Sequence, residues 1–293
     1  MWRFLMLAHL LWMTVAAHAE LRVVYPNEEG RAGHNYGAQV LALALAKSGV
    51  PYTLTIHPAR VNQERARVMI EEGQISVYDF GTSAEFEQRL LPVYFPIDRG
   101  LLGYRLCVIH RDNADAFARI HALEQLREKT AGPGVNWADT AILRHAGITV
   151  HVAPWESLFQ MVESKRFDFF PLGASEASTL LHEYQSLAPN AIVDTHLVLI
   201  YPFGRLFFVR KDNAALRDAI QSGLEQPFAD GSFQQLFADF WSLSLTTVTL
   251  KPEFAVHRYM NVFSSFILGT YEKPLKGTSQ NACIYVDRIK ARQ

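Results

Sequence analysis

In the first eighty residues, the spacing of hydrophobic positions switches between that typical of a strand and that typical of a helix. Three short apolar segments, LRVVYP (21–26), YTLTIH (52–57) and ISVYDF (75–80), have the length and pattern typical of strands. The segments between them, 36–49 and 60–73, have apolar residues at helical spacing, and each ends at a glycine. This order of strands and helices predicts parallel pairing with right-handed crossovers, and therefore an α/β sheet.

The same alternation returns after GLLGYRLCVIH, a long apolar segment that predicts another strand (100–110). A glycine-rich turn (131–134) lies between two of the helices that follow. The predicted helices are 117–129, 136–147 and 155–165, and the predicted strands are 149–153, 166–171 and two within 191–211. The helical segment 213–241 comes next, with breaks expected at Pro227 and near Asp230–Gly231.

Two α/β units in succession predict two lobes, with the long strands near 100–110 and 195–210 as crossings between them. Lobe 1 would then be discontinuous, formed by 20–108 and 205–250, and lobe 2 would be 109–204. Two such lobes would face one cleft across a two-strand hinge and close around a ligand. Residues 251–293 show no clear period and are assigned to a C-terminal tail.

The first nineteen residues have the pattern of a secretory signal peptide. Arg3 precedes a short apolar run, and Ala17-His18-Ala19 offers a small-x-small cleavage pattern before Glu20. A membrane anchor is the alternative, but the run is short for a span of roughly 20 residues. No cysteine follows the run, so a lipid anchor is not expected. The sequence therefore predicts a soluble protein exported to the periplasm.

Composition and charge argue against several classes of function. The chain has 293 residues, 49% of them hydrophobic and 19% charged, which is enough to fill a globular core. A net charge of −1 argues against a nucleic-acid binder with a broad basic surface, although a local anion site remains open. Two cysteines form no framework, and Cys107, in an apolar run, is expected to be a buried free thiol. No zinc or catalytic metal motif occurs, so no metal or cofactor is expected.

Five segments, taken in order, resemble a known family. They are YGAQVLALALAKSG (36–49), ARVMIEEGQISVYDFGTS (66–83), LLPVYFPIDRGLLGYRL (90–106), and the longer blocks 134–177 and 197–237. Together with the N-terminal signal pattern, this order is similar to extracytoplasmic solute-binding proteins of family 3, the amino-acid-type periplasmic binding proteins. The resemblance covers roughly residues 20 to 241. It implies a type II periplasmic binding protein fold.

The chain departs from that family at two positions. The resemblance implies Thr-x-x-Arg after the third strand, where the arginine grips a ligand carboxylate. Here the segment reads Ser83-Ala84-Glu85-Phe86, and phenylalanine cannot make a bidentate contact. Arg89 is offset by three residues. In the similar subgroup an arginine also follows Phe-Pro in the lobe-2 strand, and here Leu172 stands there. Both differences weaken the expectation of an α-amino acid as ligand.

The segment GPGVNWADT (132–140) is the first candidate binding element. A helix N-terminus offers unpaired N–H groups and partial positive charge to an anion. Asn136, Trp137, Asp139 and Thr140 are therefore candidate ligand contacts. The alternative is a helix cap at Asn136 with Trp137 in the core.

Further candidates lie at strand ends. In this fold aromatic side chains such as Tyr25 and Tyr78 often stack on ligand, and core packing is their alternative. Hydroxyls of Thr82 and Ser83 can orient a polar ligand or cap the next helix. Glu176 is a candidate ammonium acceptor, or else begins the following helix.

Three other charged residues complete the sequence-based set. Asp168 is expected to pair with Arg166 or another neighbour. Arg99 and Arg105 lie near the first crossing and are further candidates for holding an anion.

The leading hypothesis is a periplasmic protein that captures a small polar or anionic solute and presents it to a membrane transporter, such as an ABC transporter, or to a sensor. Transport would require other subunits. An enzyme on the same fold, of dehydratase type, is an alternative because fold does not fix function, and Glu176 or Asp139 would serve as its acid or base. The eleven histidines form no catalytic set visible in sequence. A degenerate binding protein without ligand is the third hypothesis.

Overall fold

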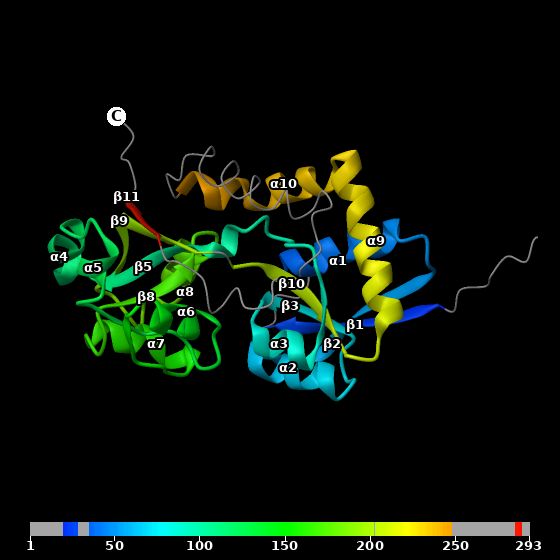
Figure 1. Cartoon of the computed structure of the whole chain (residues 1–293), viewed down its shortest axis with the longest axis horizontal. Coiled ribbons are helices and arrows are strands. Elements are labelled where there is room, and N and C mark those ends of the chain that lie inside the picture. Colours follow the sequence, from blue (N-terminus) through cyan, green and yellow to red (C-terminus); the bar gives the residue numbers. More distant parts are fainter. Residues whose placement is uncertain (1–19, 29–34, 202, 248–284, 289–293) are drawn as a thin grey trace, which may run out of the picture.

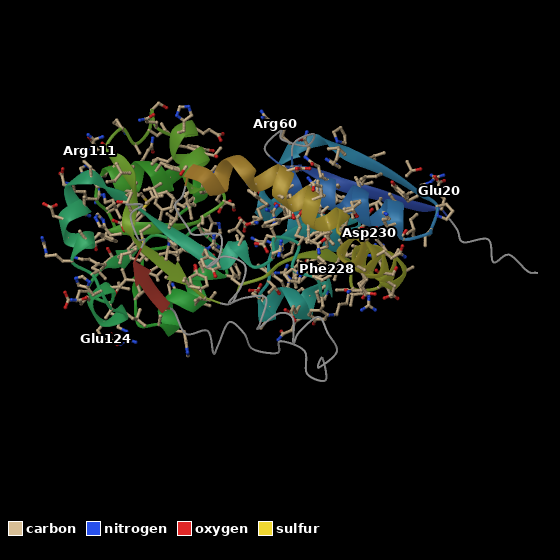
Figure 2. The ribbon with its side chains drawn as sticks, turned by 90° about the horizontal axis from the view of Figure 1, so that it is seen from above. Glu20, Arg60, Arg111, Glu124, Phe228 and Asp230 are labelled. Carbon is tan, nitrogen blue, oxygen red and sulfur yellow. The ribbon has the colours of Figure 1, made fainter. Side chains whose placement is uncertain are left out.

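The computed structural model of the chain describes residues 20–28, 35–201, 203–247 and 285–288. These residues form two α/β lobes that lie side by side (Figure 1). Figure 2 shows the two ends of this arrangement, with Glu20 on one lobe and Arg111 and Glu124 on the other. The predicted signal peptide and most of the predicted tail, with Cys283, lie outside the described residues. No helix in the described ranges is long and apolar enough to span a membrane.

In the described residues, lobe 1 contains five strands in two sheets. Strands β1 and β2 pair in parallel, as the alternation predicts, whereas β10 joins β3 and β4 by antiparallel pairing. The strands are β1 (Leu21–Glu28), β2 (Tyr52–Val61), β3 (Val77–Gly81), β4 (Leu91–Val93) and β10 (Arg205–Val209). Helices α1 (Tyr36–Lys47), α2 (Gln63–Glu71) and α3 (Ala84–Arg89) belong to the same lobe. Because β10 follows β5 to β9 of lobe 2 in sequence, lobe 1 is discontinuous.

Lobe 2 is built on one six-stranded sheet with the order β11-β9-β5-β8-β6-β7. The strands are β5 (Tyr104–His110), β6 (Thr130–Ala131), β7 (Thr149–Val150), β8 (Phe169–Gly173), β9 (Ala191–Ile200) and β11 (Tyr285–Arg288). Strand β6 pairs in parallel with β7 and β8, and the pairs β5–β8, β5–β9 and β9–β11 are antiparallel. The helices are α4 (Ala114–Ala118), α5 (Leu123–Leu126), α6 (Asp139–His145), α7 (Trp155–Glu163) and α8 (Ala177–Glu183).

Within residues 20–247, the described chain crosses between the lobes through two adjacent segments. The first, 94–103, includes the 3₁₀ turn η1 (Leu101–Gly103), and the second includes Tyr201, Phe203 and Gly204. Backbone bonds join the two crossing regions, from Tyr201 N to Gly103 O at 3.1 Å and from Ile97 N to Arg205 O at 3.0 Å. The segment 104–108, which the sequence analysis placed in lobe 1, lies in the lobe-2 sheet because all of β5 pairs with β8 and β9.

Two long helices follow β10. Helix α9 (Ala214–Asp230) continues through Pro227, so the break expected there was wrong. The second expected break is confirmed at Gly231, whose φ of 85° suits a residue without Cβ. Helix α10 (Ser232–Thr247) then packs on α1 and α9 and also contacts α8 of lobe 2. It lies along the top of both lobes in Figure 1 and crosses between them in Figure 2.

Lobe-2 helices are shorter than the apolar pattern indicates. The predicted helix 117–129 consists of two short helices, α4 and α5, with a non-helical segment between them. Helix α6 begins at Asp139, three residues after the expected start, because Asn136 has a left-handed φ of 59° and therefore cannot continue a right-handed helix. Strand β11 lies within the segment 251–293, which was assigned to a C-terminal tail.

The core of lobe 2 contains Cys107, which is a free thiol with no exposed surface, as expected. Burial raises its thiol pKa, and the nearby Asp194 adds to this. In the Cys283→Ser variant we therefore expect the Cys107 thiol to react with an aromatic disulfide reagent only after unfolding in denaturant. Absorbance of the released thiolate measures this. Rapid and complete labelling under native conditions, in a chain whose circular dichroism is unchanged, would contradict it.

Candidate ligand-binding site

Each lobe places a buried tyrosine and a buried aspartate together with an arginine near a crossing segment. In lobe 1, Tyr25 at β1 donates from its hydroxyl to Asp79 of β3, and Arg205 at the start of β10 donates from Nε to the same carboxylate. The Tyr25 hydroxyl also lies 3.1 Å from Oδ1 of Asn35, which caps α1. Burial raises the Tyr25 pKa, and Asp79 raises it further. A Cβ on Gly37 would lie 1.9 Å from the Asp79 carboxylate, so this close approach requires glycine.

The two candidate tyrosines are core residues in this structure. Tyr25 has no exposed surface and Tyr78 is 1% exposed, and their rings meet edge to face at 6.1 Å. Tyr78 also packs on Phe80. Neither ring offers a free face for stacking, so the core alternative describes both.

The hydroxyls after β3 are already engaged. Ser83 caps α3 by accepting from Phe86 N at 3.2 Å, which confirms the capping alternative. Thr82 donates from Oγ1 to Glu87 at 2.6 Å, and its backbone N–H donates to Gly204 O in the second crossing segment at 2.9 Å. These bonds fix the loop after β3 against the crossing.

Lobe 2 repeats the pattern with Tyr201, Asp139 and Arg105. Arg105, 4% exposed, donates from Nη2 to the Asp139 carboxylate at 3.0 Å. Its Nε donates to the Tyr201 hydroxyl at 3.2 Å and lies 2.9 Å from the same carboxylate. The Tyr201 hydroxyl donates to Asp139 as well. Burial raises the pKa of Tyr201, with Asp139 as the next cause. Burial alone would lower the Arg105 pKa, but Asp139 outweighs it and the pKa is raised.

Glu176 and Asp139 were predicted to meet a ligand, but both face Arg105. Glu176 accepts from Gly173 N at 3.0 Å and lies 3.6 Å from Arg105 Nη1, with its side chain 42% exposed. It is the N-cap residue of α8, but its side chain makes no capping hydrogen bond. The first turn of α6 carries the Asp139 carboxylate itself, so the predicted anion position there is already occupied by a protein anion.

Residues 133–137 form a loop that reaches lobe 1. Asn136 donates from Nδ2 to Glu64 of α2 at 2.7 Å, and its carbonyl accepts from Arg67 of α2 at 3.5 Å. Asn136 is therefore an interlobe contact, and the prediction of a helix cap at this residue was wrong, since Ala138 is the N-cap of α6. Trp137 packs against Gly134 and lies 5.9 Å from the ring of Trp155. The Thr140 hydroxyl is buried with no hydrogen-bond partner among the described residues.

The guanidinium of Arg67 lies over the ring of Phe86, the position at which the family resemblance implies an arginine. Its guanidinium carbon lies 4.6 Å from the ring centroid of Phe86 and 5.7 Å from that of Phe80. Arg89 is no replacement, because it is bound on the surface by Glu71 and Glu85. Sequence reasoning missed Arg67 because it reads as an ordinary charged position of a surface helix.

The remaining predicted charges have other roles. Asp168 accepts from N and Oγ1 of Thr130 at 2.7 and 2.8 Å, so its partner is this threonine and not Arg166. Arg99 packs over Phe237 of α10 at 5.2 Å. Leu172 is a core residue of β8. No group of three or more potential metal-ligating side chains occurs in the described part of the chain.

Comparison with known proteins identifies the fold. No protein-family model matches the chain, and no curated protein matches its sequence. The substrate-binding protein of an amino acid ABC transporter is similar in structure, with a TM-score of 0.53 and 13% identity over 75% of this chain and 99% of that one. An ancestral arginine-binding protein bound to glutamine gives 0.54 and 18% over 76% and 99%. A histidine kinase sensor domain similar to periplasmic binding proteins gives 0.53 and 12% over 76% and 96%.

The chain therefore has the two-lobe type II periplasmic binding protein fold, as the sequence predicts. At these identities the likeness shows the fold alone.

Proposed function

We propose that the protein is an extracytoplasmic solute-binding protein that captures a small polar or anionic solute between its lobes. The observation that carries this is the approach of the two lobes at Asn136, which contacts Glu64 and Arg67 of α2. A solute held at such a junction binds the closed arrangement better than the open one. This difference in affinity is what drives closure.

The same proposal gives a role to the N-terminal residues and sets the residue at which lobe 2 begins. Residues 1–19 would direct export to the periplasm, and residue 104 rather than 109 would begin lobe 2, since β5 belongs wholly to its sheet. The closed form would be read by a membrane transporter or by a sensor. Both kinds of system occur among the structural neighbours, which include a transporter's substrate-binding protein and a sensor domain.

The site favours binding over dehydratase-type catalysis. A catalytic acid or base must reach its substrate, yet Asp139 is 2% exposed and held by Arg105 and Tyr201. Glu176 is more exposed but also faces Arg105. Asp139 therefore lacks the open position that the enzyme alternative requires, and Glu176 would have to give up its bond from Gly173 N to act on a substrate.

A thermal-shift screen of the exported chain tests the proposal. The probes are amino acids, organic acids, polyamines and small peptides. A ligand at 100 times its dissociation constant stabilises the native state by about 2.7 kcal/mol. For a protein of this size we expect an increase in Tm of roughly 5–10 °C.

Two outcomes would contradict solute binding. If no probe shifts the Tm, the degenerate alternative is favoured. If a probe is converted to product during incubation, as chromatography would show, the enzyme alternative replaces the proposal.

A further inference from the structure

Two arginines are buried in the described part of the chain, and they differ in their partners. Arg105, 4% exposed, has Asp139 and Glu176 within ion-pair distance. Arg67, 8% exposed, has no carboxylate at that distance among the described residues. The acceptor it has is the Asn136 carbonyl, at a long 3.5 Å.

A buried guanidinium with so few acceptors is an unfavourable arrangement. It carries five N–H donors in a planar fork and stays charged. The rings of Phe86 and Phe80 attract the charge but accept none of these N–H bonds in the guanidinium plane. Burial lowers the pKa of Arg67, which is the mark of a charge that its surroundings leave incompletely stabilised.

We propose that Arg67 is the anion anchor of the interlobe site and binds a carboxylate of the captured solute beside the Asn136 carbonyl. This inference rests on the proposed function and names the chemical class of the solute. A carboxylate matches the guanidinium fork with two parallel N–H···O bonds. Because Arg67 comes from lobe 1 and Asn136 from lobe 2, a solute bound there would be enclosed as the lobes meet.

The surrounding charges favour a singly charged group. Glu64 and Glu85 both act electrostatically on Arg67, and the neighbouring cation Arg89 is already bound by Glu71 and Glu85. A doubly charged phosphate at Arg67 would meet these two carboxylates, with Arg89 already engaged. A carboxylate needs only one guanidinium.

The first experiment compares Arg67→Met with Arg65→Met. Arg65 lies on the same helix but is half exposed, with Glu72 as an ion-pair partner at 3.6 Å, so its variant removes an equal charge from the surface. The probes are the twenty amino acids, succinate, citrate and inorganic phosphate, and each carboxylic acid that binds is paired with its primary amide. Titration calorimetry gives the affinities.

We expect Arg67→Met to weaken binding of the carboxylate probe by about 10- to 100-fold, and Arg65→Met to change it by less than about 2-fold. The amide should bind wild type as weakly as the acid binds Arg67→Met, and the affinity of the amide should not fall further in that variant.

The proposal is overturned if Arg67→Met binds the acid as tightly as wild type does, or if wild type binds the amide as tightly as the acid. Tighter, Arg67-dependent binding of inorganic phosphate overturns the carboxylate class. If no probe binds wild type, the proposed function itself fails.

The second experiment needs no ligand and tests whether Arg67 has a structural role. An anchor held ready for an anion should cost stability in the ligand-free protein. We therefore expect the Tm of ligand-free Arg67→Met to equal that of Arg65→Met or to exceed it by about 2–4 °C. A Tm more than about 4 °C lower would assign Arg67 to the stability of the lobe junction and overturn the proposal.

Discussion

Replacing Arg105 with methionine is expected to lower the free energy of unfolding by about 3–5 kcal/mol. The change leaves Asp139, 2% exposed, without its cation, while methionine preserves most of the side-chain volume. Tyr201 still donates one hydrogen bond to Asp139, but a single hydroxyl does not balance a buried charge. Urea denaturation followed by circular dichroism measures the effect.

Two control variants make this prediction specific. One replaces an exposed arginine, and the other removes both partners of the buried ion pair. Arg89→Met breaks the surface ion pairs with Glu71 and Glu85 and should cost no more than about 1 kcal/mol. The double variant Arg105→Met with Asp139→Leu removes both charges and should recover most of the loss. If Arg105→Met costs no more than Arg89→Met, the buried pair of Arg105 and Asp139 does not stabilise lobe 2.

Gly223→Ala is expected to destabilise the protein by up to about 2 kcal/mol, the second largest effect. A Cβ at this position would lie 2.0 Å from the backbone oxygen of Ala44, so α9 would be pushed away from α1. The backbone oxygen of Ala44 cannot rotate aside, so overpacking should cost up to about 3 kcal/mol. The gain in helix propensity from glycine to alanine, about 1 kcal/mol, offsets only part of this cost. Chemical denaturation gives the difference from wild type.

Ser222→Ala serves as the matched change, since Ser222 is the exposed neighbour of Gly223 on the same helix. Its free energy of unfolding should lie within about 0.5 kcal/mol of wild type. A Gly223→Ala variant as stable as Ser222→Ala would mean that the two helices separate at little cost.

The architecture was predictable because it depends on local patterns. Apolar spacing identified α1, α2 and the strands β1 to β3, and the order of elements gave the two-lobe class. The boundary between the lobes was harder to predict, because GLLGYRLCVIH has the pattern of a single apolar strand. In the structure its first part is the 3₁₀ turn η1 in the crossing and its second part is β5 in lobe 2.

The side-chain partners at the site could not be predicted in the same way. Arg105 and Asp139 are 34 positions apart, and Tyr201 is 62 positions from Asp139, so no local pattern connects them. Candidate residues were found because they follow strand ends, where side chains of a parallel sheet converge. Whether a carboxylate such as Glu176 faces a solute or an arginine depends on tertiary packing.

The pairing of β11 with β9 adds a tether between the lobes. Helices α9 and α10 follow β10 out of the lobe-1 sheet, yet β11 lies in the lobe-2 sheet, so the backbone passes from one lobe to the other a third time. Because β11 covers the outer edge of β9 along residues 197–200, this part of β9 is not open to pairing with a strand of another molecule.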